Sequence, residues 1–537
     1  MRKVVAMVGA AALIVSGTIL AIPSASAAPV CGTKAGIETC GGVLSNGAAY
    51  VIKIPSNFKG TIFYWNHGFR PSFPYPGYTP PKGIEEITMG NNITKTDVTA
   101  QMLNLGYGVA AYDRSTGGLH GWNTAESVSM LKELVDTTKA KYPSATKSVI
   151  YGASGGAPVV NMFAEKYPEL TDAVGLATPV ATNIGRQLQS GCDLFFIMSV
   201  FFDPTIKGCD AFGQKGVAGH MVALGELAKV GALLTALSKN FGAPGLEYPA
   251  ALKGSGIPQR SALLLMGLLA GMPAKSQHMD GISTSAAVPE QSINATLAIL
   301  ENTLDASATG ILAGQAVAEV VGGKFYDNTK TDYTALLDDA DSGRYNLGLS
   351  GDEAITAMLT MLKMAPRITG EATAMAGIKA LDKVNYTSTK PTILIHNEAD
   401  RLVWPGQSVA YVDAKRAVFD AQQSKYEDAV ASAKTGAQIL AAKKLKPTWN
   451  TLALYAMTPE TYTKFTDTGL PVLSGVGATS GVGHQSFPSA QVLAWVKLLY
   501  YSANSGHLPS DALIAKNIAA GVGLNPDLEF RPTELKY

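Results

Sequence analysis

The chain has 537 residues, which by length alone is enough for two or three domains. Its formal net charge is +1, only 16% of its residues are charged, and it contains no long run of Lys and Arg, so nucleic acid is disfavoured as a partner. With 47% hydrophobic residues, the chain has either a large buried surface or an apolar substrate site, and composition does not decide between them.

The N-terminal segment has the three parts of a secretory signal peptide. Arg2 and Lys3 form a basic start, Val4 to Ile22 is apolar, and Ala25-Ser26-Ala27 fits an A-x-A cleavage site. An uncleaved anchor is the alternative, because the apolar stretch approaches the ~20 residues that a membrane span needs. We expect cleavage near residue 28, a secreted or envelope-associated protein, and no stable membrane insertion, since we find no later stretch long enough to span.

The chain contains four cysteines: Cys31, Cys40, Cys192 and Cys209. An even number of cysteines in an exported protein predicts two disulfides. Three pairings are possible, and the most economical one joins Cys31 to Cys40 and Cys192 to Cys209. No C-x-x-C pair or neighbouring His pair accompanies these residues, so their spacing is not that of a zinc site.

Short apolar runs alternate with helical segments in the first third of the chain and again near its end. After a hairpin or two short strands within Gly42 to Ile54, the predicted strands are Gly60 to Trp65, Gly108 to Tyr112, Ser148 to Ile150, Asp172 to Ala177, Thr392 to His396 and, as the last strand, Leu452 to Tyr455. This alternation predicts an α/β fold with a mostly parallel sheet and helices on both faces.

The pattern changes at about Asn183 and is mainly helical as far as Val384. The best helix candidates are Met221 to Leu237, Ser261 to Met272, Ile293 to Leu304 and Ile355 to Met364. We interpret 183–388 as a helical cap inserted between two core segments, 28–182 and 389–537. An independent helical domain is the alternative. A further helical segment, Ser408 to Lys443, is unusually long.

A glycine-flanked serine lies where a predicted strand meets a predicted helix, in Tyr151-Gly152-Ala153-Ser154-Gly155-Gly156. Such a G-x-S-x-G turn holds the serine in a strained conformation with its Oγ exposed, close to a helix N-terminus that favours negative charge. A dinucleotide-binding turn would need a glycine at Ser154. A phosphate-binding loop would need a following Gly-Lys-Ser/Thr. The stretch resembles the nucleophile elbow of the α/β-hydrolase superfamily.

Two earlier loops extend this resemblance. His67-Gly68 follows a predicted central strand, as in the oxyanion loop of the superfamily, which implies that the backbone N–H groups of Phe69 and Gly155 are the oxyanion donors. His67 precedes the serine, so we expect it to be structural. Asp113-Arg114-Ser115-Thr116-Gly117-Gly118 partly matches the superfamily's Asp-x-Arg-Gly-x-Gly loop, with Ser115 where glycine is common.

The remaining members of a catalytic triad are expected after the cap. Asp400 lies on a loop behind a predicted strand and is the expected acid, with Glu398 as its rival. His484 lies on a glycine-flanked loop before a helix and is the expected base, in preference to His507 in the polar tail. The order Ser154, Asp400, His484 is that of the α/β-hydrolases.

The resemblance covers roughly Ile52 to Ala181 and Pro391 to Tyr501, and it implies a serine hydrolase that acts through an acyl-enzyme. We expect a secreted carboxylic-ester hydrolase acting on a small-molecule or polymeric ester. A serine peptidase or amidase of the same fold is the second hypothesis, and a non-catalytic binding protein is the third. The triad requires no cofactor and no metal is expected, while the oligomeric state is not indicated.

Overall fold

The computed structural model describes residues 29–71, 73–75, 78–80, 83–84, 86–89, 97–115, 121–180, 184–239, 252–276, 279, 289–381, 383–458, 481–521 and 523–526. The predicted signal peptide, residues 1–27, lies outside the described residues.

One mixed sheet organises the described part of the chain. Its strands are β1 (Val30–Lys34), β2 (Ile37–Val43), β3 (Ala49–Pro55), β4 (Thr61–Asn66), β5 (Gly108–Tyr112), β6 (Lys147–Ala153), β7 (Ala173–Ala177), β8 (Thr392–Asn397), β9 (Thr451–Ala456) and β10 (Leu524–Asn525). They are ordered β1-β2-β3-β5-β4-β6-β7-β8-β9-β10. The strands from β5 to β9 run parallel, and the outer pairs on both sides are antiparallel.

This strand order, with its single β4–β5 exchange and helical crossovers, decides the fold. The chain has the α/β-hydrolase fold. Strand β9 was predicted to be the last strand, and this was wrong, because the two-residue β10 pairs with it at the sheet edge. So short a strand carries no readable alternation of apolar and polar residues.

Each face of the sheet builds its own hydrophobic core, because successive strand residues point to opposite faces. Ile62 and Tyr64 pack with helices α2 (Thr124–Lys141) and α3 (Ala157–Lys166) on one face. Phe63 and Trp65 pack on the other face with α1 (Thr99–Asn104) and α14 (Ser489–Ser505). Because both faces are covered, strands β4, β7 and β8 are buried along their whole length.

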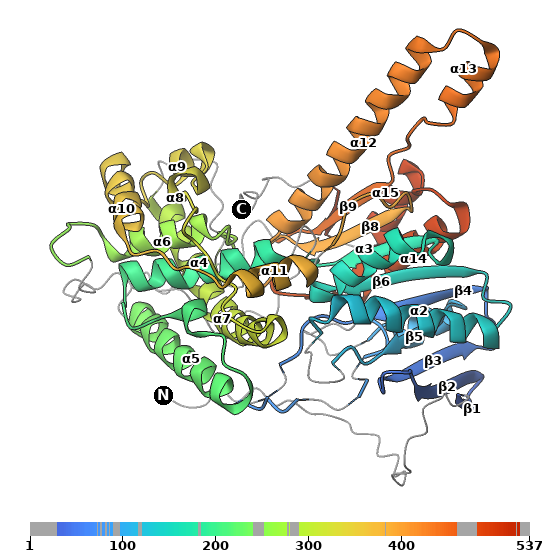
Figure 1. The fold of residues 1–537 in the computed structure, drawn as a ribbon, viewed down its shortest axis with the longest axis horizontal. Helices are drawn as coiled ribbons and strands as arrows, with labels where there is room; N and C mark the ends of the chain where they lie inside the picture. The colour runs from blue at the N-terminus through green and yellow to red at the C-terminus, as the bar shows by residue number, and fades with distance from the viewer. Residues whose placement is uncertain are drawn as a thin grey trace.

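A helical insertion separates β7 from β8 and lies beside the sheet (Figure 1). Its helices are α4 (Ile184–Phe201), α5 (Gly216–Lys239), α6 (Gln259–Leu269), α7 (Pro289–Val321), α8 (Tyr333–Leu336), α9 (Asp339–Arg344), α10 (Asp352–Met364) and α11 (Ala372–Leu381). Its hydrophobic core also includes Phe73, Trp122, Val403 and Trp404, which lie on loops of the sheet domain. The insertion therefore packs onto loops that follow β4, β5 and β8, at the carboxyl ends of these strands.

The predicted helical segment Ser408 to Lys443 consists of two helices, α12 (Gly406–Ser432) and α13 (Gly436–Lys443), which form a hairpin that extends away from the body (Figure 1). A capping box explains the break, since the Thr435 side chain accepts from the Gln438 N–H and the Gln438 side chain accepts from the Thr435 N–H.

The prediction that no later stretch is long enough to span a membrane was wrong, because one later helix meets the criteria of length and hydropathy. Residues Gly216–Ser238 of α5 are long and apolar enough, with a mean hydropathy of 1.5, and only 28% of that window is buried. The helix nevertheless packs along α7 within the insertion. Length and hydropathy alone do not distinguish such a helix from a membrane span.

Both disulfides have the short-range pairing. Cys31 joins Cys40 across the β1–β2 hairpin, where the two residues are direct antiparallel partners. Cys192 in α4 joins Cys209 in the 3-10 turn Gly208–Ala211, closing a loop of 17 residues inside the insertion. In the first disulfide Cys31 is exposed on the edge strand and Cys40 is buried, whereas both half-cystines of the second are buried.

Replacing Cys192 and Cys209 by alanine should lower the free energy of unfolding by about 3 kcal/mol, because a closed loop of this length restricts the unfolded chain. Urea denaturation followed by circular dichroism measures the loss. The matched control replaces Cys31 and Cys40, and it should lose less because the sequence separation of that pair is only 9 and its closed loop is shorter. Equal losses in the two variants would contradict the prediction.

Candidate active site

Ser154 occupies a strained turn between β6 and α3. Its backbone φ is +52°, a value that non-glycine residues rarely adopt. A Cβ on Gly152 would lie 2.7 Å from the carbonyl oxygen of Asn66, and one on Gly156 would lie 2.3 Å from the same oxygen. Both flanking positions therefore require glycine, because β4 passes directly behind the turn.

The loop after β4 lies against this serine. A Cβ on Gly68 would be 2.8 Å from the Cβ of Ser154, so only glycine fits at this point of closest approach. The backbone nitrogen of Phe69 lies 3.4 Å from the position that a Cβ on Gly155 would take. The two expected oxyanion donors, Phe69 and Gly155, are thus neighbours beside Ser154.

A buried guanidinium joins the Phe69 loop to the serine turn. Arg114 is fully buried, and its side chain donates to the backbone oxygens of His67, Gly121 and Gly155 and to the Ser127 hydroxyl. Burial lowers the pKa of Arg114 to about 10, which still leaves it charged at neutral pH. The sequence motif drew attention to this arginine, but its partners come from four separate segments and could not be read from the sequence.

His67 has a structural environment. Its Nε2 accepts from the Arg114 backbone N–H at 2.9 Å, so its Nδ1 carries the proton and donates to the Gly68 oxygen at 2.8 Å. Burial, together with the charges of Arg70 and Arg114, holds the pKa of His67 well below its ordinary value. A buried neutral imidazole with both nitrogens engaged shapes the loop and has no free nitrogen for proton transfer.

Asp400 and His484 form a hydrogen-bonded pair across two loops. The His484 Nδ1 lies 2.8 Å from Asp400 Oδ2, while Asp400 Oδ1 accepts from the backbone N–H groups of Leu402 and Val403. Burial by itself would raise the pKa of Asp400, but His484 and His396 hold the carboxyl below its usual range. An ionised Asp400 fixes the tautomer in which Nδ1 of His484 is protonated and Nε2 is a proton acceptor.

Glu398 faces away from His484. Its carboxylate accepts from the Thr458 N–H at 2.8 Å and from the Thr458 hydroxyl at 2.7 Å, and it lies 3.4 Å from Nζ of Lys275 in the insertion. Of the two acids considered, the structure therefore brings Asp400 to the imidazole. His507 is exposed beyond the end of α14 and does not line the cavity described below.

Sequence reasoning missed two groups around the imidazole. His396, at the end of β8, is fully buried with its Nε2 3.5 Å from Asp400 Oδ2 and 2.9 Å from the Val403 oxygen. The side-chain nitrogen of Gln485 lies 3.2 Å from Nε2 of His484. A histidine within an apolar strand looks like an ordinary core residue, and no sequence signal marks Gln485.

Ser154 and His484 open onto one cavity of about 390 Å³ between the sheet domain and the insertion. Phe69, Trp122 and Tyr75 line it from the sheet domain, and helices α4 and α7 line it from the insertion. Arg70 and Glu86 also reach the cavity, and their charged groups are 3.2 Å apart. The chamber is of the size and mixed character that small-molecule sites have.

Among the described residues, one group has spacing suited to a metal ion: Cys31, Glu38 and Cys40. Its two cysteines form a disulfide and offer no thiolate, so the donor set does not suit a metal.

No family model and no curated protein matches the chain. Among solved structures, it is similar to an esterase from Aspergillus oryzae (14% identity, 72% of this chain and 68% of that one, TM-score 0.32). It is also similar to the rice cell wall degrading esterase LipA from Xanthomonas oryzae (11%, 71% and 79%, TM-score 0.29) and to a tannin acyl hydrolase from Aspergillus niger (12%, 81% and 77%, TM-score 0.28). Likenesses this weak do not bear on activity, and the fold assignment rests on strand order and connections.

Asp400→Asn should lower kcat on an ester substrate by about 10⁴-fold, because an amide at this position favours the wrong imidazole tautomer. Glu398→Gln is the matched control and should retain most of the activity while lowering the melting temperature, since it weakens the contact with Lys275. Steady-state kinetics and thermal melts of both variants test this. Loss of activity in Glu398→Gln equal to that in Asp400→Asn would contradict the assignment.

Proposed function

We propose that the chain is a secreted serine hydrolase that cleaves carboxylic esters, with Ser154 as nucleophile, His484 as base and Asp400 as the acid that orients it. The observation that carries the proposal is the 2.8 Å contact of His484 with buried Asp400, beside a cavity onto which the strained Ser154 opens. Nucleophile, base and orienting acid in one cleft are the elements of acyl transfer.

The proposed reaction follows from these groups. Serine is a weak nucleophile at its free pKa, so Nε2 of His484 accepts the hydroxyl proton as Oγ attacks the ester carbonyl. The N–H groups of Phe69 and Gly155 stabilise the oxyanion, each typically contributing ~2.7–4 kcal/mol. The imidazolium, stabilised by Asp400, protonates the leaving alcohol, and water then hydrolyses the acyl-enzyme by the same steps.

An ester is favoured over a peptide by the charges in the cavity. An exopeptidase binds a free amine with unpaired acidic groups, but Glu86, which lines the cavity, is paired with Arg70. The wall formed by the insertion is largely apolar. A non-catalytic binding protein is disfavoured because simple binding would need neither the strained serine nor the histidine–aspartate pair.

Secretion is supported by the N-terminal sequence and by the two disulfides, which form in oxidising compartments.

Ser154→Ala should abolish hydrolysis of p-nitrophenyl acetate, because it removes the nucleophile, and should leave the circular dichroism spectrum unchanged. A fluorophosphonate probe should label the unmodified protein at Ser154, as read by peptide mass spectrometry. Retained turnover in the alanine variant would overturn the serine mechanism, and an unlabelled native protein would favour the binding alternative.

A substrate panel separates the two enzymatic alternatives. We expect kcat/KM on p-nitrophenyl esters to exceed that on aminoacyl and peptidyl p-nitroanilides, because no unpaired acidic group of the described cavity lining is placed to bind a free amine. Faster cleavage of the anilides would favour a peptidase.

A further inference from the structure

The insertion contributes a mostly apolar wall to the cavity. Helices α4 and α7 supply it, and its apolar members include Leu188, Leu194, Phe195, Leu312 and Ala313. Apolar surface exposed to a chamber of this kind is stabilised when an apolar ligand displaces the water. The wall thus favours an uncharged hydrocarbon portion of the ligand over a sugar or a charged group.

Two glycines interrupt this wall within helix interiors. Gly191 lies in α4 and Gly310 in α7, and both line the cavity. Glycine destabilises a helix relative to alanine, so a glycine in such a position needs a reason. Packing accounts for Gly310, because a Cβ there would lie 3.3 Å from the Phe195 ring. A Cβ on Gly191 would meet no atom within 4 Å, so protein packing does not require this glycine.

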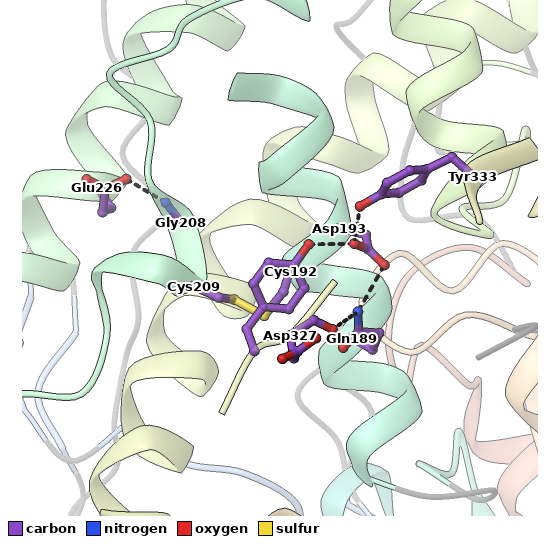
Figure 2. Close-up of a disulfide and its surroundings, with 9 residues drawn as sticks. Gln189, Cys192, Asp193, Gly208, Cys209, Glu226, Asp327 and Tyr333 are labelled. Atoms are coloured by element: carbon purple, nitrogen blue, oxygen red, sulfur yellow. Dashed lines mark hydrogen bonds between the residues drawn. A yellow bond between two sulfur atoms is a disulfide. The ribbon is translucent and has the colours of Figure 1, made fainter. Parts of the chain in front are cut away.

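The residues on either side of Gly191 are firmly anchored. The Ser190 hydroxyl donates to the Ala270 oxygen at 2.6 Å and accepts from the indole of Trp404. Cys192 is joined to Cys209, as Figure 2 shows.

The next residue, Asp193, is fully buried and accepts from the Tyr333 hydroxyl at 2.6 Å (Figure 2). It also accepts from the Tyr326 hydroxyl at 2.5 Å. The Cys209 end of the disulfide is held as well, because the Glu226 carboxylate accepts from the N–H of the preceding residue, Gly208, at 2.8 Å. Because these contacts hold both neighbours of Gly191 in place, a larger side chain at position 191 would extend into the cavity.

We propose that Gly191 sets the size of the apolar portion of the ester, which lies along α4 over the open Cα of this residue. This inference rests on the proposed function and deepens it. The substrate class is an ester of an extended aliphatic or aromatic group, and any side chain at position 191 occupies the space that this group fills.

The test uses Gly191→Ala and Gly191→Leu in the full mature chain. One arm measures kcat/KM on p-nitrophenyl esters from acetate to decanoate, and the other measures it on acetate esters of alcohols from ethanol to decanol. The ratio of the rate on the long substrate to that on the short one should fall in Gly191→Leu by about tenfold or more in at least one arm, as one or more methylenes lose their site. Gly191→Ala should lie between the native protein and the leucine variant, and the arm that responds identifies the acyl or the alcohol side.

Gly225→Leu is the matched control, because Gly225 also lies inside a helix with open space around it but is exposed on α5 and does not line the cavity. Its ratio should equal that of the native protein. The labelling rate with a short-chain relative to a long-chain fluorophosphonate gives the same comparison without turnover. If Gly191→Leu does not fold, the alanine variant carries the test.

Unchanged ratios in both arms, with Ser154 still labelled, would overturn the role of Gly191 and leave the proposed function intact. A native protein that neither hydrolyses the esters nor reacts with the probe would instead overturn the proposed function.

Discussion

The loop after β8 binds the site and the insertion together, and the geometry of both depends on it. Asp400 on this loop faces His484. Three other residues of this loop contact the insertion. Glu398 lies close to Lys275, and Arg401 pairs with Asp305 of α7 at 2.6 Å. The Trp404 indole donates to the Ser190 hydroxyl of α4. The carboxylate that orients the imidazole and the wall that shapes the cavity therefore share one support. A shift of the insertion would act on the imidazole through this short segment of backbone.

Arg114 provides the equivalent support on the other side of the serine. Its guanidinium donates to the carbonyl oxygens of His67 and Gly155, and so ties the loop that contains Phe69 to the turn at Ser154. In the proposed reaction, the N–H groups of Phe69 and Gly155 are donors held by this framework, and donors that are already fixed need no reorganisation when charge develops. The strain at Ser154 persists for the same reason, because the surrounding backbone leaves it no alternative.

Sequence alone predicted the central strands, the turn at Ser154, and the neighbourhoods of Asp400 and His484, because each depends on residues adjacent in the chain. It named Asp400 as the acid but kept Glu398 as a rival, since the partners that engage Glu398, Thr458 and Lys275, are distant in the chain. It likewise gave no sign of Gly191, whose significance lies in the empty space next to it. The capping box at Thr435 was readable, but the uninterrupted helical composition around it concealed the break.

The α12–α13 hairpin has a different consequence. Its buried residues end at Lys415 except for Ala442, so the outer part of the arm contributes almost nothing to either core of the sheet. Its backbone amides should exchange with solvent through local opening, at a free energy well below that of global unfolding. We therefore expect the arm to behave as a separate cooperative unit, one that can fray, be nicked by a protease or accept an inserted peptide while the strands beside it stay folded.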